Sequence, residues 1–275
     1  MVDSEVVKMH ELMQWYEDLK VQVSGKEDIV FPDEGKAYRT VDYLNLDGFY
    51  PGYFASKPRV LFMGRESREA SGCNRMDTDR AFLRDNNING FGFAFWQRVF
   101  YIVYGILHDG KVSFMEIPSA DEIKESCVKD NCFPFAFINL SKYSNDSRRW
   151  QADSALINRF LEDAELEKRN FLREQISILD PDVIVSGNLW GNNGIDRDKL
   201  ELVFPEKDFK KIEELSEEGV SDVYDFSFEG KTIRFIDLYH FSAIKVGKTM
   251  GYELDKTYFY DPVMKAVFGN REVGL

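Results

Sequence analysis

The sequence predicts an α/β protein, a three-layer α/β/α sandwich around a four-stranded, mostly parallel sheet. The first observation is a set of short apolar runs, each typical of a strand buried on both faces. These runs lie at 59–64, 134–140, 182–187 and 232–240. The second observation is that helical patterns separate them, at 93–107, 155–166 and 170–179. Strands that alternate with helices indicate a parallel sheet with helices on both faces.

The remaining elements flank this alternation. Residues 4–20 have apolar side chains at helical spacing and predict an amphipathic first helix. Residues 24–57 show no sustained period and predict a long irregular connection that wraps the domain or lines a site. We therefore expect an N-terminal helical extension, residues 1–57, packed on an α/β domain of residues 58–275. The segment 223–228 should pair with the last strand as an antiparallel hairpin, and 254–268 should form a closing helix.

The composition indicates an acidic, folded protein. The chain carries 35 Lys and Arg against 48 Asp and Glu, a net charge of −13, and 44% of its residues are hydrophobic. We find neither the basic segment followed by an apolar one that is typical of a signal peptide nor an apolar run long enough to span a bilayer. We therefore expect a cytoplasmic protein without a membrane partner. The net charge disfavours nucleic-acid binding, although basic and acidic residues cluster separately, which allows a polarised surface.

Several classes of site find no support in the motifs. The three cysteines form no C-x-x-C pair, which argues against a disulfide framework and against a zinc or iron–sulfur site built on cysteines alone. The three histidines are too few and too scattered for a polyhistidine metal centre. We therefore expect no metal and no cofactor.

Ligands of open parallel sheets bind beyond the carboxyl ends of the strands, which selects the loops that follow the predicted strands. Glu66 comes directly after the first strand and Gly64, between Arg65 and Arg68. Guanidinium groups at these positions would favour the ionised carboxylate, which could then orient a water molecule or stabilise a cation. The alternative is an ion-paired acid at a helix N-terminus.

The second and last strands also end in polar residues. Asn139 closes an apolar run, and its amide, which must find partners if buried, suits the edge of a pyrimidine base or ties two loops together. His240 ends the last strand with Ser242 close behind, as a site residue or as a structural histidine. Phe91 and Phe93 precede a helix in a glycine-rich loop and could stack on a planar ligand.

Four segments, in their order along the chain, resemble the uracil-DNA glycosylase superfamily. They are RVLFMGRESRE at 59–69, FAFINLSKYSND at 135–146, FLREQISILDPDVIVSGN at 171–188 and YHFSAIK at 239–245. The resemblance covers about residues 58–250 and implies that family's fold. It also implies a DNA repair enzyme that flips uracil or a related damaged base out of DNA and hydrolyses its N-glycosidic bond without metal.

The resemblance assigns roles to individual residues. Asn139 would read the uracil edge, and Phe91 or Phe93 would stack on the flipped base. His240 would polarise the base oxygen that gains charge, and Glu66 would orient water or stabilise the sugar cation. The remaining substrate-binding positions would be Gly64, Arg65 and Ser242. The DNA-binding positions would be Ser67, Lys142, Ile244 and Lys245, with Ile244 as a wedge.

The chain departs from the family at identifiable positions. Ser67 stands where the first loop usually has a proline, and Phe241 replaces the proline of His-Pro-Ser. Three cysteines do not supply the four ligands of the cluster-bearing branches. These departures favour a second hypothesis, a catalytically inactive module that binds a nucleobase, a nucleotide or a protein partner. A third is that the acidic face imitates DNA. We expect a monomer.

Overall fold

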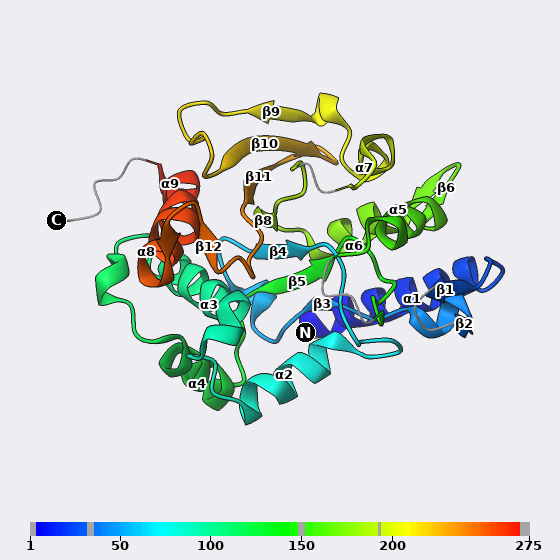
Figure 1. Ribbon diagram of the computed structural model, residues 1–275, viewed down its shortest axis with the longest axis horizontal. Coiled ribbons are helices and arrows are strands. Elements are labelled where there is room, and N and C mark those ends of the chain that lie inside the picture. Colours follow the sequence, from blue (N-terminus) through cyan, green and yellow to red (C-terminus); the bar gives the residue numbers. More distant parts are fainter. Residues whose placement is uncertain (1–3, 32–35, 148–151, 192–193, 270–275) are drawn as a thin grey trace.

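The computed structural model describes residues 4–31, 36–147, 152–191 and 194–269, and these form a seven-stranded mixed sheet between helices (Figure 1). From edge to edge the strands are β3 (Gly48–Phe49), β5 (Ala136–Asn139), β4 (Val60–Gly64), β8 (Val183–Gly187), β11 (Lys231–Leu238), β10 (Asp222–Phe228) and β9 (Phe209–Lys211). The predicted α/β class is confirmed. The predicted strand count of four is too low, because β3 and β9, in addition to the expected hairpin strand β10, also join the sheet through antiparallel pairs.

The four strands expected from the apolar runs form the parallel centre of the sheet. β4 pairs in parallel with β5 on one side and with β8 on the other, and β11 continues beyond β8. β10 pairs antiparallel with β11, as the predicted hairpin requires, and β9 adds to its outer edge. The chain leaves β4 toward β5 and returns on the opposite side to β8. The switch point, where ligands of such sheets bind, therefore lies between β4 and β8.

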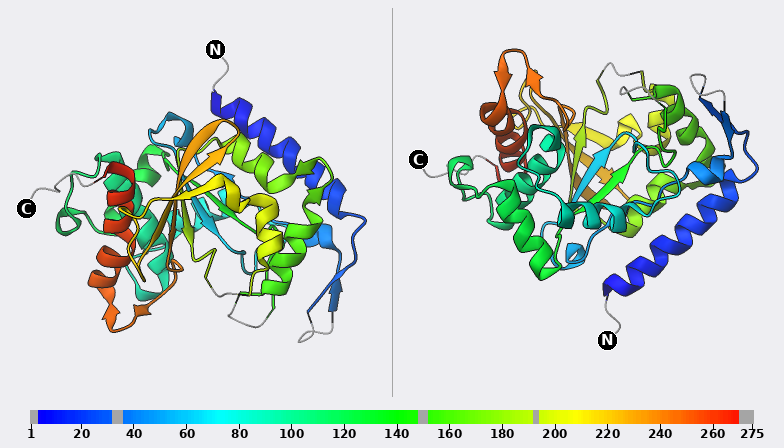
Figure 2. Two further views of the ribbon diagram at one scale, coloured as in Figure 1. Left: turned by 90° about the horizontal axis from the view of Figure 1, so that it is seen from above. Right: turned by 60° about the horizontal axis from the view of Figure 1, so that its bottom comes forward.

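Helices lie on both sides of the sheet (Figure 2). They are α1 (Ser4–Val23), α2 (Arg75–Asp85), α3 (Ala94–Leu107), α4 (Ala120–Asp130), α5 (Ser154–Asp163), α6 (Phe171–Leu179), α7 (Arg197–Val203), α8 (Gly251–Asp255) and α9 (Asp261–Phe268), with a π-helical turn at Lys256–Tyr260. α1 packs against α6, whereas α3 packs against α4 and α9. No helix in the described ranges has the length and apolarity needed to cross a membrane.

Three short antiparallel pairs lie outside the main sheet. They are β1 (Ile29–Phe31) with β2 (Lys36–Tyr38), β6 (Glu165–Leu166) with β7 (Arg169–Asn170), and β12 (Lys245–Val246) with β13 (Thr249–Met250). The β12–β13 pair follows the loop after β11 and projects from the body of the protein in Figure 2.

The N-terminal segment contributes directly to the core and the sheet. Leu12 and Leu19 of α1 are fully buried in the main hydrophobic cluster. β3 forms the sheet edge beside β5, with Gly48 opposite Phe137. Asp47, just before β3, is buried under the end of β5. Residues before position 58 therefore help to hold one of the strands that end at the candidate site.

Candidate functional site

A cavity of about 300 Å³ opens at the carboxyl ends of β4, β5 and β11. Its lining includes the loop that follows β4, with Glu66, together with Asn139 at the end of β5 and His240 after β11. The structure thus brings together three residues that lie far apart in the sequence. Gly64, Arg65, Ser67 and Ser242 also line this cavity. Its volume is at the lower end of the range for small-ligand pockets.

Glu66 presents one satisfied and one unsatisfied carboxylate oxygen. Its Oε1 accepts hydrogen bonds from Asn145 Nδ2 at 2.8 Å and from the backbone N–H of Asp153 at 2.9 Å. Its Oε2 is buried without a hydrogen-bond partner among the described residues. Burial raises the pKa of Glu66 to about 7, although the Asn145 and Asp153 hydrogen bonds oppose that change. A carboxyl group with a pKa near neutrality and a free oxygen suits general acid–base chemistry.

Asn139 is held through its backbone, which leaves its amide for the cavity. The Asn139 N–H donates to Asp47 Oδ2 at 2.8 Å, and its carbonyl accepts from Lys142 Nζ at 2.6 Å. Its side-chain amide makes no hydrogen bond to any residue that the structure describes. A Cβ atom on Gly64 would lie 2.4 Å from Asn139 Oδ1, so the glycine permits this amide position.

Lys142 belongs to the support of Asn139 and cannot touch DNA. It is fully buried, and its Nζ lies 2.7 Å from Asp47 Oδ1. Asp47 Oδ1 also accepts from Gln175 Nε2 at 3.0 Å. The predicted DNA contact of Lys142 is therefore wrong. Ser67 is buried too, with its Oγ bonded to Asn45 Nδ2 at 2.7 Å, so it lines the cavity but cannot reach an external phosphate backbone.

His240 is exposed at the mouth of the cavity, and its Nδ1 accepts a hydrogen bond from the backbone N–H of Ser242 at 3.2 Å. The surrounding chain removes water from the ring, and this desolvation, with the positive charges of Arg65 and Arg98, lowers the pKa of His240 to about 4. The ring is therefore neutral at pH 7. Because Nδ1 accepts, the proton of the neutral ring resides on Nε2, which can donate to a ligand oxygen.

A buried arginine that sequence reasoning missed fixes the loop after β11. Arg98 of α3 is 2% exposed, pairs with Asp255 Oδ1 at 2.8 Å and donates to the carbonyl of Phe241. Its guanidinium lies 3.9 Å from the ring centroid of Phe259. Phe241, the residue in place of the family's proline, packs its buried ring 5.8 Å from that of Phe62. These contacts position the backbone next to His240.

The aromatic wall of the cavity comes from a different residue than expected. Phe93 packs on Phe82 with ring centroids 5.6 Å apart and is not part of the cavity lining, so its predicted stacking role does not fit. The side chain of Phe91 lies outside the described part of the structure. Phe95, in the first turn of α3, lines the cavity and contacts Phe137 at a centroid distance of 5.2 Å.

The residues expected to touch DNA beyond the cavity lie at the surface. Ile244 is 53% exposed, and Lys245, at the start of β12, is exposed as well. Both follow the Ser242 rim of the cavity along the chain. Their contact with DNA stays a prediction.

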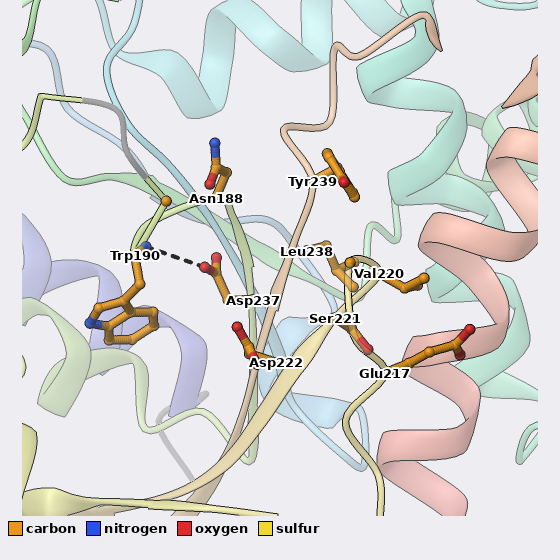
Figure 3. Close-up of a pocket in the computed structure, with 11 residues that line it drawn as sticks. Asn188, Trp190, Glu217, Val220, Ser221, Asp222, Asp237, Leu238 and Tyr239 are labelled. Carbon is orange, nitrogen blue, oxygen red and sulfur yellow. Dashed lines mark hydrogen bonds between the residues drawn. The ribbon is translucent and has the colours of Figure 1, made fainter. Parts of the chain in front are cut away.

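A second cavity, of about 250 Å³, lies beside the ends of β8 and β11 (Figure 3). Asp237 faces it and accepts hydrogen bonds from Ser186 Oγ at 2.7 Å, Leu189 N at 2.9 Å and Trp190 N at 3.3 Å. Both carboxylate oxygens of Asp237 are thus occupied in fastening the loop after β8. We assign this aspartate a structural role.

In the described ranges no three His, Cys, Asp or Glu side chains are grouped so that they could hold a metal ion. Comparison of the chain with protein-family models, with curated proteins and with solved structures finds no match.

Proposed function

We propose that the protein is a uracil-DNA glycosylase-like repair enzyme, which binds a flipped uracil or related damaged base in the cavity of Glu66, Asn139 and His240 and hydrolyses its N-glycosidic bond. The observation that carries the proposal is the convergence of three polar side chains on one cavity, supplied by three strand ends. Glu66 has a carboxylate oxygen, Oε2, without a hydrogen-bond partner among the described residues. Asn139 contributes its side-chain amide, and His240 contributes a ring whose Nδ1 is hydrogen-bonded to the Ser242 N–H, which leaves Nε2 for a ligand.

The Asn139 amide and the Phe95 ring would recognise the base. An amide presents a donor and an acceptor side by side, which complements the adjacent N–H and carbonyl groups of uracil. Since its backbone is fixed by Asp47 and Lys142, the Asn139 side chain is preorganised for this contact. The Phe95 ring supplies an apolar wall for stacking.

Glu66 and His240 would act on the two partners of the reaction. Glu66 takes a proton from a water molecule whose oxygen forms a bond to the sugar C1′ atom, while the bond from C1′ to the base nitrogen breaks. The base leaves with the electron pair of that bond. The neutral His240 ring donates a hydrogen bond from Nε2 to the base oxygen that gains negative charge.

A single-turnover base-release assay tests the proposal on uracil-containing single- and double-stranded oligonucleotides. We expect Glu66→Gln, Asn139→Ala and His240→Ala each to reduce release by about 100-fold or more. Glu69→Gln, which removes a charge from an exposed position of the same loop, should leave release unchanged. Release that survives in both Glu66→Gln and Asn139→Ala, or no release by the folded wild-type protein, would overturn the proposal. Nucleobase binding without cleavage would favour the inactive module instead.

A further inference from the structure

Arg65 is a half-buried cation without an acidic partner. One of its terminal nitrogens donates to the carbonyl of Asn188 at 2.8 Å, and its Nε–H is buried without a hydrogen-bond partner. The nearby carboxylates that raise the pKa of Arg65 are those of Asp237 and Glu66, and neither of them forms an ion pair with Arg65. No other acidic group in the described ranges does so.

This arrangement is unfavourable for a protein without a ligand. Buried charges are normally paired, and a buried donor without a partner loses its hydrogen bonds to water and gains none in return. Arg65 also lies at the switch point of the sheet, since it follows β4 and reaches the loop after β8. A ligand that brings negative charge and acceptor oxygens would satisfy both the charge and the free Nε–H.

The other charged groups of the cavity favour the same kind of ligand. Arg68 and Arg75 line it together with Arg65, whereas Glu66 is the single acidic residue among the described residues of the lining. Arg75 is neutralised by Asp79, at 2.9 Å. Arg65 forms no ion pair with any described residue, and burial favours the protonated, uncharged form of Glu66.

We propose that Arg65 forms an anion subsite in this cavity and that the subsite binds a phosphate group of the nucleotide whose base enters the same cavity. The identity of the ligand as a nucleotide rests on the proposed function, whereas the anion subsite rests on Arg65 alone. Guanidinium groups bind phosphate oxygens through paired, charge-assisted hydrogen bonds. The phosphate could belong to a free nucleotide or to a polynucleotide backbone, which have this chemistry in common.

The first experiment measures phosphate binding without any base. Thermal unfolding is followed with inorganic phosphate and with chloride at equal ionic strength. We expect phosphate to raise the Tm of the wild-type protein and of Arg84→Met, a control that removes an exposed arginine of α2. The rise should vanish in Arg65→Gln, which keeps a donor for the Asn188 carbonyl, and should persist in part in Arg65→Lys. Equal shifts in the wild type and Arg65→Gln, or no shift in the wild type, would overturn the subsite.

The second experiment tests the nucleotide by calorimetry with deoxyuridine and its 5′-monophosphate. We expect the monophosphate to bind the wild-type protein roughly tenfold or more tightly and this advantage to be lost in Arg65→Gln. An advantage that Arg65→Gln retains would overturn the assignment. Phosphate binding without affinity for either nucleoside would support the anion subsite and overturn the proposed base recognition. Competition by a short single-stranded oligonucleotide distinguishes the two sources of the phosphate. A site for a polynucleotide backbone should bind the oligonucleotide more tightly than the monophosphate, whereas a site for a free nucleotide should not.

Discussion

Replacing Glu66 by Gln should stabilise the protein at alkaline pH, while it abolishes the proposed chemistry. Burial raises the pKa of Glu66 from its ordinary value of 4.5 to about 7. Between these values the folded protein keeps a proton that the unfolded chain has released, so the free energy of unfolding falls as the pH rises. Above about pH 7 Glu66 is ionised in the folded protein, and its buried charge lowers the free energy of unfolding by the full amount. Gln is uncharged at every pH, so the variant does not lose this stability.

The magnitude follows from the same two values. At about 1.36 kcal/mol per pH unit, the difference corresponds to about 3 kcal/mol, an upper limit because the side chain retains some solvent exposure. Gln can keep the two hydrogen bonds that Glu66 Oε1 accepts, from Asn145 and from the Asp153 N–H. We therefore expect Glu66→Gln to gain about 1–3 kcal/mol over the wild type at pH 8 and little at pH 4.

Urea unfolding at pH 4, 6 and 8 measures this difference for the wild type, Glu66→Gln and the exposed control Glu69→Gln. The control should follow the wild type at all three values. A gain in stability of Glu66→Gln over the wild type that is the same at pH 4 and pH 8 would refute the reasoning.

The ionisation of Glu66 should also govern catalysis, since a general base must be ionised. Base release by the wild type should therefore rise with pH, reach about half of its maximum near pH 7 and level off above that value.

Other substitutions test the parts of the site that hold the ligand. Lys142→Met should lower the free energy of unfolding by about 3–5 kcal/mol, because it leaves the carboxylate of Asp47 buried and unpaired; a loss below about 1 kcal/mol in urea titration would contradict this. Gly64→Ala should weaken deoxyuridine binding at least tenfold in calorimetry, since its Cβ would displace the Asn139 amide, and unchanged binding would contradict that geometry. Phe95→Leu should cost about 1–3 kcal/mol of binding free energy through lost stacking.

The centre of the sheet could be predicted because its strands are buried on both faces. Val60–Met63 and Val183–Ser186 are buried without interruption, and this produces the apolar runs that the sequence displays. Edge strands lack that signal. β3 has two residues, and β9 reads Phe-Lys-Lys, so neither carries a hydrophobic pattern long enough to recognise.

The candidate site was predictable to the extent that strand ends determine it. Glu66, Asn139 and His240 each lie at or just after the end of a predicted strand, and parallel strands bring such ends to one edge of the sheet. Lys142 was misassigned because a lysine in a polar loop normally lies at the surface. Its partner Asp47 comes from a segment without periodicity, so no local pattern indicates the buried pair. Phe95 has the spacing of a core residue, and only the packing of α3 shows that its ring borders the cavity.

The acidic chain and the cationic cavity together favour a short ligand. A long duplex needs a basic surface that neutralises many phosphates, and a net charge of −13 opposes such a footprint. A mononucleotide or a short single strand needs only the local charge of Arg65 and Arg68, because salt screens charges that lie more than about 8 Å away in solvent. We therefore expect base release from short single strands to exceed release from a long duplex of the same sequence, and the gap to narrow as salt weakens the repulsion of the duplex. Faster release from the duplex at low salt would mean that basic residues outside the cavity carry the binding.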